Sequence, residues 1–325
     1  MKAVVASRPG GPDVLELREV EAPSPGLGEV AIDVLGAGVN RADLLQRRGH
    51  YPPPPGASDI IGLEVSGRVA ELGAAVDGWT VGEPCVALLA GGGYAERVVV
   101  PAGQVLSPPP GLDLLAAAGV IEVAATVVSN LQLGRLRSGE VFLVHGGAGG
   151  IGSFAIQYAK ALGATVITTA GSADKLTYCR LLGADHAISY RDDWPAAVRA
   201  ATEGGVDVVL DNMGAKYLDH HLDLLAPNGR LVIIGFQGGT TATLDLRRLL
   251  AKGTSIAAAS LRARPASEKS AICAQVAAEV WPLLGDGTIR PTEHRVYPLA
   301  EAAEAHARLE SGDHTGKIIL QIASS

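Results

Sequence analysis

The chain has 325 residues, of which 47% are hydrophobic, and a formal net charge of −7 at pH 7. This length is typical of about two domains with sizeable cores, and the acidic balance gives no electrostatic support to nucleic-acid binding. The longest apolar stretch, Leu114 to Val128, is interrupted by polar and glycine residues, so we expect no membrane span. The chain has three widely spaced cysteines, Cys85, Cys179 and Cys273. Because they form neither a metal-ligand cluster nor a disulfide framework, we expect the protein in the reducing cytoplasm.

The first 110 residues are predicted to form short strands separated by turns rich in glycine and proline. Val30, Ile32 and Val34 alternate with neighbours that face the other side, which is typical of a half-buried strand. Further strands are predicted at 3–6, 15–20, 64–72, 84–89 and 94–100. Many short strands of this kind indicate a partly closed barrel. The run 108–111 marks a boundary or a rigid loop, and a helix is predicted at 114–131.

A glycine-rich turn follows a short apolar strand at 141–144. The turn fits G-x-G-x-x-G at Gly147, Gly149 and Gly152, and it also fits G-x-x-G-x-x-G if the first glycine is Gly146. After it come a helical pattern and a second strand at 165–170, so the segment is predicted to be a strand–helix–strand unit. In this context the glycines predict a turn that lets a pyrophosphate approach the N-terminus of the helix. The alternative is a flexible turn that binds nothing.

The end of the second strand indicates which dinucleotide binds. Enzymes that use NAD usually place Asp or Glu there to accept a hydrogen bond from the ribose 2′-hydroxyl, but no acid occurs from Thr168 to Ser172. Ser172 can donate a hydrogen bond and Lys175 supplies positive charge, so we expect NADPH rather than NADH. Asp174, whose direction is open, lies between them. Alternatively, Ser172 caps the next helix and Lys175 is a solvated surface lysine.

Strands and helices continue to alternate towards the C-terminus. Strands are predicted at 186–189, 206–210, 230–234 and 255–260, and helices at 172–182, 194–202 and 216–225. This alternation predicts a doubly wound parallel sheet. A helix at 271–284 and a strand at 318–322 are too few to form a domain, so we expect them to return to the first domain and make it discontinuous.

The chain resembles the medium-chain dehydrogenase/reductase superfamily, and within it the zinc-free, zeta-crystallin-like quinone oxidoreductases. The resemblance covers nearly the whole chain and rests on the glycine turn and on three further segments: 38–43 (GVNRAD), 61–67 (IGLEVSG) and 316–320 (GKIIL). It implies an α/β protein with a doubly wound parallel-sheet Rossmann domain that binds NADPH, and a GroES-like, strand-rich, partly open barrel domain. The expected bounds are 123–261 for the Rossmann domain, and 1–122 and 262–325 for the discontinuous substrate domain.

The resemblance also implies that no metal takes part. Zinc-dependent relatives carry Cys where this chain has Asn40 and His where it has Leu63, and neither residue can replace such a ligand. The lobe in which relatives hold structural zinc with four cysteines offers only Cys85. We therefore expect a substrate that accepts hydride without a Lewis acid, such as a quinone or an activated enone.

Cofactor-binding residues carried over from the resemblance fall into three groups. The pyrophosphate turn is matched by Gly149, Gly150, Ile151 and Gly152, the 2′-phosphate pocket by Gly171, Ser172, Lys175 and Tyr190, and the nicotinamide half by Asn40, Thr126, Gly235, Phe236, Leu261 and Lys317. Two of them have structural alternatives, because Phe236 can be a core aromatic residue after a strand and Lys317 can be an exposed lysine.

On the substrate side we expect Tyr51, with Asn40 and Asp43 completing a polar patch. Tyr51 precedes four consecutive prolines, which hold an extended segment and present the tyrosine with little loss of entropy. Its hydroxyl can donate to a quinone oxygen. Asp43 can instead be the N-cap of a helix that starts near Ala42, and His50 is more often a solvated loop histidine than a proton donor.

These residues predict a cytoplasmic, NADPH-dependent quinone oxidoreductase that uses neither zinc nor flavin. One alternative is a reductase of enones or enoyl thioesters on the same scaffold, and another is a non-catalytic NADPH-binding protein with a structural or regulatory role. Whether electrons pass singly or as hydride is left open. Family members often dimerise through an edge strand of the cofactor domain, here predicted at 255–260, so we expect a homodimer.

Overall fold

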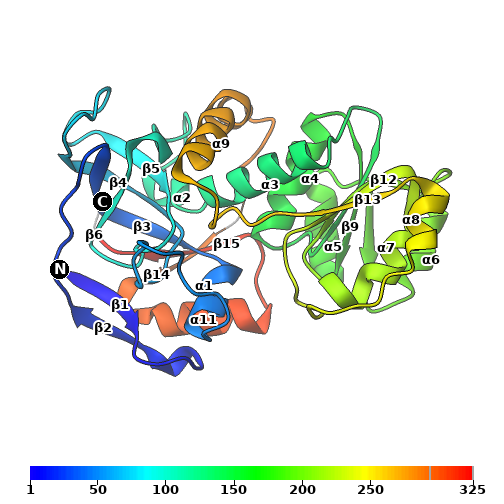
Figure 1. Ribbon diagram of the computed structural model, residues 1–325, viewed down its shortest axis with the longest axis horizontal. Coiled ribbons are helices and arrows are strands. Elements are labelled where there is room, and N and C mark those ends of the chain that lie inside the picture. The colour runs from blue at the N-terminus through cyan, green and yellow to red at the C-terminus, as the bar shows by residue number, and fades with distance from the viewer. Residues whose placement is uncertain (293, 324–325) are drawn as a thin grey trace. The chain divides into compact units, whose positions relative to one another are not determined.

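The computed structural model describes residues 1–292 and 294–323 (Figure 1). The chain forms two compact units. The first consists of Met1–Ala125, Leu261–Gly287 and Pro291–Ser325, and the second of Thr126–Ser260 with Thr288–Arg290. The first unit is discontinuous because the C-terminal segments return to the fold begun by the N-terminal part of the chain.

A seven-stranded mixed sheet forms the centre of the first unit. Its order is β14-β15-β3-β4-β5-β7, with β6 also paired to β3, and only the β14–β15 pairing is parallel. The strands are β3 (Glu29–Val39), β4 (Glu64–Leu72), β5 (Pro84–Leu88), β6 (Arg97–Pro101), β7 (Val105–Leu106), β14 (His294–Pro298) and β15 (Lys317–Gln321). A separate antiparallel pair consists of β1 (Lys2–Ala6) and β2 (Leu15–Glu19). The expected strand-rich, GroES-like architecture is confirmed.

Short helices connect and flank these strands. They are η1 (Pro12–Val14), α1 (Arg41–Arg47), η2 (Ala102–Gln104), α2 (Leu114–Ala117), α9 (Ala266–Glu279), α10 (Trp281–Gly285), η4 (Leu299–Glu301) and α11 (Ala302–Ser311). The prediction of one helix at 114–131 was wrong, because α2 ends at Ala117 and a new helix, α3 (Ile121–Leu133), begins after Gly119. Glycine favours such a break because it loses more conformational entropy than other residues when its backbone is fixed in a helix.

The second unit is built on six parallel strands in the order β10-β9-β8-β11-β12-β13. The strands are β8 (Val141–His145), β9 (Thr165–Ala170), β10 (His186–Ser189), β11 (Val206–Asp211), β12 (Leu225–Ile233) and β13 (Ser255–Ala258). The helices are α4 (Gly150–Ala161), α5 (Ala173–Leu181), α6 (Trp194–Ala200), η3 (Gly214–Tyr217), α7 (Leu218–Leu224) and α8 (Leu246–Lys252). The predicted doubly wound Rossmann sheet is confirmed.

The strand order reverses at β8, which pairs with β9 on one side and with β11 on the other. In open parallel sheets, ligands bind beyond the carboxyl ends of the strands at such a switch point. Within the part of the chain that the structure describes, no helix combines the length and apolar character that a bilayer span requires.

Candidate active site

The glycine turn between β8 and α4 is determined by close backbone packing. Gly146 has a φ of +69°, a conformation that side chains rarely tolerate. A Cβ atom on Gly152 would lie 2.3 Å from the carbonyl oxygen of Gly146, and one on Gly147 would lie 2.2 Å from Oγ1 of Thr168. Gly146 therefore sets the turn, and Gly147 and Gly152 let the strand, the turn and the helix approach each other.

The outer side of the same turn is open. A Cβ atom on Gly149 would meet only the Gly146 carbonyl oxygen, at 3.5 Å. Gly149 is also the N-cap of α4 and has no side chain that could accept from the first N–H groups of the helix. These N–H groups have no acceptor inside the helix, and together with the helix dipole they favour an anion. The turn therefore fits a pyrophosphate group.

At the carboxyl end of β9, Gly171 lies against Tyr190. A Cβ atom on Gly171 would be 2.2 Å from the Tyr190 hydroxyl oxygen, so only glycine lets this ring lie over the strand end. Ser172 caps α5, since its hydroxyl oxygen accepts from the Lys175 backbone N–H at 3.4 Å. The hydroxyl hydrogen remains able to donate. This arrangement of a hydroxyl group, a lysine and an exposed ring, with no carboxylate from Thr168 to Ser172, fits a 2′-phosphate.

The residues expected around the nicotinamide occupy different environments. Phe236 is 55% exposed in the loop after β12, so the alternative of a core aromatic residue is wrong. Gly235 packs closely on Asn212, whose carbonyl oxygen would be 3.1 Å from a Cβ at that position. Thr126 in α3 is buried, and Leu261 is half-buried in the first unit.

A buried histidine pair lies beneath the glycine turn and was not expected from the sequence. His145 Nδ1 contacts Thr169 Oγ1 at 2.9 Å, and its Nε2 lies 2.8 Å from Nε2 of His221. Burial lowers the pKa of His145 to about 3, so the ring is neutral at physiological pH. Burial also raises the pKa of the neighbouring Asp211 to about 6, although backbone N–H groups oppose this. The two rings pack against Trp194 and Tyr217 in the core of the second unit.

In the first unit, Asn40, Glu64 and Lys317 form a buried polar cluster. The Lys317 ammonium group donates to Asn40 Oδ1 at 2.7 Å and to Glu64 Oε1 at 2.6 Å, and Asn40 Nδ2 donates to Glu64 at 3.0 Å. Their exposed fractions are 7%, 0% and 4%, so the alternative of an exposed Lys317 is wrong. Gly38 makes room for the cluster, because a Cβ there would lie 2.2 Å from Glu64 Oε1.

Asp43 connects this cluster to helix α1. Its Oδ2 accepts from the Asn40 backbone N–H at 2.7 Å and from the Tyr94 hydroxyl at 3.0 Å. Asp43 is therefore the third residue of α1, and the alternative of an N-cap at this position is wrong, since Asn40 is the N-cap. The side chain is fully buried, and desolvation raises its pKa to about 7. Asp43 therefore does not reach the surface, and it orients Asn40 through the hydrogen bond from the Asn40 backbone N–H.

The hydrogen bonds continue from Tyr94 through His306 to Arg47. The Tyr94 hydroxyl lies 3.0 Å from His306 Nε2, and Arg47 donates to His306 Nδ1 at 3.1 Å. Because Arg47 can only donate, His306 carries its proton on Nε2, and burial lowers its pKa to about 3. Every donor in this series points towards Asp43, so the series stabilises the carboxylate form of Asp43.

Tyr51 is held by Arg262, which the sequence analysis did not single out. The Arg262 guanidinium lies 5.1 Å from the centre of the Tyr51 ring and donates to the Tyr51 carbonyl oxygen at 3.1 Å. It also donates to the Ala90 carbonyl oxygen and to Gln46 Oε1, both at 2.8 Å. The arginine therefore fixes the loop that begins the proline run and restricts the tyrosine ring from one side.

Comparisons with known proteins agree with this architecture. Residues 26–110 match the alcohol dehydrogenase GroES-like domain, and residues 150–275 match the family described as zinc-binding dehydrogenase. A quinone oxidoreductase of Pseudomonas aeruginosa is 35% identical over 316 residues, which is 96% of each chain. The chain belongs to the medium-chain dehydrogenase/reductase superfamily. It is thus an NAD(P)-dependent oxidoreductase of this superfamily.

Two further relatives of this superfamily member differ in the substrates that their names give. A 2-haloacrylate reductase of Burkholderia is 32% identical over 332 residues, covering 98% of each chain. The structure of Escherichia coli quinone oxidoreductase complexed with NADPH superposes with a TM-score of 0.88 at 28% identity, covering 99% of this chain and 100% of the other.

In this superfamily member, Asn40 and Leu63, which we expect at the positions of the zinc ligands of zinc-dependent relatives, are both buried. Among the residues that the structure describes, no group of three or more His, Cys, Asp or Glu side chains could hold a metal ion. Cys85 is a buried thiol whose pKa burial raises to about 12, so it is not poised to act as a thiolate ligand.

Proposed function

We propose that this oxidoreductase uses NADPH to reduce quinones, without zinc or flavin. The observation that carries the cofactor assignment is the end of β9, where Ser172 and Lys175 adjoin Gly171 and no acidic residue occurs from Thr168 to Ser172. The quinone assignment is supported by quinone oxidoreductase relatives that align along the whole chain.

In this proposal the cofactor supplies the hydride from nicotinamide C4, and the protein supplies binding and orientation. The first N–H groups of α4 hold the pyrophosphate, while Ser172 and Lys175 hold the 2′-phosphate. The Tyr51 hydroxyl donates to an acceptor oxygen, and Arg262 fixes its ring. Asp43 orients Asn40 from beneath the surface. The proton that completes the reduction comes from solvent.

A second candidate function is reduction of an activated carbon–carbon double bond. It is favoured by the 2-haloacrylate reductase relative, which matches this chain at 32% identity over its whole length. Hydride addition to an enone or acrylate creates negative charge on a carbonyl or carboxyl oxygen, so the same tyrosine hydroxyl serves either acceptor.

The deciding experiment measures NADPH consumption with matched panels of quinones, enones, 2-haloacrylates and enoyl thioesters. We expect the largest kcat/KM for quinones. A larger value for any double-bond acceptor replaces the first candidate with the second. Tight NADPH binding with no turnover of any acceptor contradicts both, and favours a binding protein with a structural or regulatory role.

We also propose that the protein is a homodimer that pairs through β13. This strand is an edge of the six-stranded sheet, since among the described residues it pairs only with β12. An open edge of this kind is a ready template for strand pairing. Sedimentation equilibrium should give twice the chain mass, and a concentration-independent monomer would contradict the proposal.

A further inference from the structure

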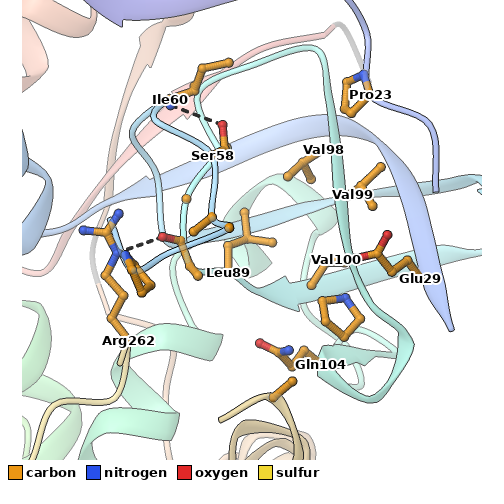
Figure 2. A pocket seen from close by; sticks show the side chains of 18 of the residues that line it. Pro23, Glu29, Ser58, Ile60, Leu89, Val98, Val99, Val100, Gln104 and Arg262 are labelled. Atoms are coloured by element: carbon orange, nitrogen blue, oxygen red, sulfur yellow. Dashed lines mark hydrogen bonds between the residues drawn. The ribbon is translucent and has the colours of Figure 1, made fainter. Parts of the chain in front are cut away.

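The first unit contains a cavity of about 700 Å³ that none of the residues assigned above to the acceptor contacts (Figure 2). Val98, Val100 and Leu89 contribute an apolar wall. A polar region of the lining comes from Gln104 in η2, from Arg262, and from the first turns of α9. Asn40, Asp43, Tyr51 and Lys317 are not among the described residues that line it.

Two of the lining residues are buried polar groups whose bonding capacity is unused. Lys269 is 6% exposed, and its ammonium group has neither a hydrogen bond nor an ion pair with residues 1–292 or 294–323. Gln104 is 1% exposed, and its side-chain amide likewise has no partner in the described chain. An ammonium group on a largely buried side chain is stabilised by an opposite charge, so its position beside the cavity favours an anionic ligand.

The surroundings of Lys269 are also positive. Helix α9 begins at Ala266, which lines the cavity, and its N-cap Pro265 offers no side-chain acceptor for the first N–H groups. The helix dipole therefore adds partial positive charge there. Within the described part of the chain, Arg262 donates to neutral oxygen atoms, those of Ala90, Tyr51 and Gln46, and contacts no carboxylate that would offset its charge.

We propose that this cavity is a binding site for a small organic carboxylate with a short apolar chain. The carboxylate contacts Lys269, the Gln104 amide and the start of α9, and the chain lies along Val98 and Val100. The carboxylates of Glu21 and Glu29 also line the cavity, so a singly charged ligand is favoured over a doubly charged phosphate. The cavity shares Arg262 with the proposed acceptor site, but the proposal does not depend on which acceptor is reduced.

Calorimetric titration of the NADPH-saturated protein with hexanoate tests this proposal. We expect saturable binding of one hexanoate per chain, and binding roughly tenfold weaker or more in Lys269→Met, because the ammonium group assigned to the carboxylate is removed. Lys160→Met is the matched control, since Lys160 is a surface lysine of the second unit paired with Asp185. Absence of saturable binding, or equal binding by Lys269→Met and the wild type, overturns the proposal.

Gln104→Leu provides a second variant that keeps both cationic side chains. It should fold with an unchanged NADPH affinity and bind hexanoate several-fold more weakly, because one amide donor is lost. Unchanged hexanoate binding by this variant contradicts the assigned position of the carboxylate. A parallel titration with inorganic phosphate separates the ligand classes, since tighter binding of phosphate than of hexanoate overturns the assignment to a monoanion.

Discussion

The glycine turn of the second unit and the polar cluster of the first unit manage charge in opposite ways. The turn offers backbone N–H groups and a helix dipole, and its residues contribute by having no side chain. The cluster consists of full charges and amides on Asn40, Glu64 and Lys317, all nearly excluded from water. A site made of backbone N–H groups destabilises the fold little when it is empty, whereas buried charges destabilise the fold unless they are paired within it.

The largest effect is expected where the buried pairing is broken. Lys317→Met leaves the carboxylate of Glu64, which is 0% exposed, without its cation. The free energy of unfolding measured by urea denaturation should fall by about 3–5 kcal/mol. The double variant Glu64→Gln with Lys317→Met removes both charges and should recover much of this loss. A loss below about 1 kcal/mol in the single variant would mean that the pair behaves like an exposed one.

The stability of the glycine turn should instead depend on the side-chain volume added at its glycines. In Gly152→Ala the new Cβ would lie 2.3 Å from a backbone oxygen atom that cannot rotate away, so we expect a loss of about 1–3 kcal/mol in unfolding free energy. Gly149→Ala meets only one atom, at 3.5 Å, so it should keep its stability and lose NADPH affinity. Gly204→Ala, with nothing within 4 Å, is the control. Equal stability of the three variants would show that packing does not determine the turn.

The positive charge of Lys175 at the end of β9 should affect the affinity for NADPH but not the affinity for NADH. Lys175→Ala is expected to weaken NADPH binding roughly tenfold and to leave NADH binding within about twofold, because only NADPH carries the 2′-phosphate. Fluorescence titration with both cofactors measures this, and Lys216→Ala removes an exposed lysine of the same unit as a control. Equal losses for both dinucleotides would refute the phosphate assignment.

The effect expected from Asp43 is a pH dependence of stability rather than a fixed loss. Its pKa in the fold is about 7 against an ordinary value of 3.8, so the folded protein retains a proton that the unfolded chain releases in this range. Stability should therefore fall as pH rises from about 4 to 7. Asp43→Asn, which keeps an acceptor but cannot titrate, should flatten this slope in denaturation curves. The exposed Asp77→Asn should not flatten it, and an unchanged slope in Asp43→Asn contradicts the prediction.

The elements that sequence patterns predicted well are those whose signal is local. The bounds predicted for β4, β9 and β10 coincide with the observed strands, because each is an apolar or alternating run that ends at a turn signal. Helices α8 and α11 were not predicted. Helix α8 is a short helix with no buried residue, although its leucines fall at helical spacing, whereas α11 buries mainly small residues, Ala302 and Ala305, beside His306.

The candidate site also has a part that local sequence patterns predict and a part that they do not. Glycine spacing reveals a backbone turn directly, but the partners of Asp43 come from distant segments. Tyr94 and His306, which contact each other, are 212 positions apart. One local signal was present, since Glu64 is a charged residue inside an otherwise apolar strand segment, 61–65. A charge in a buried strand requires a partner, although the pattern does not identify Lys317 as that partner.

Gly38 has an evolutionary consequence that follows from the space it leaves. The Glu64 carboxylate occupies the volume that a side chain at position 38 would need, with Cβ-to-oxygen and Cβ-to-carbon distances of 2.2 and 2.6 Å. The two positions therefore cannot drift independently. Where a homologue has replaced the glycine by alanine or serine, its partner position should have shortened or lost the acid, and Lys317 should then have been replaced by a neutral residue.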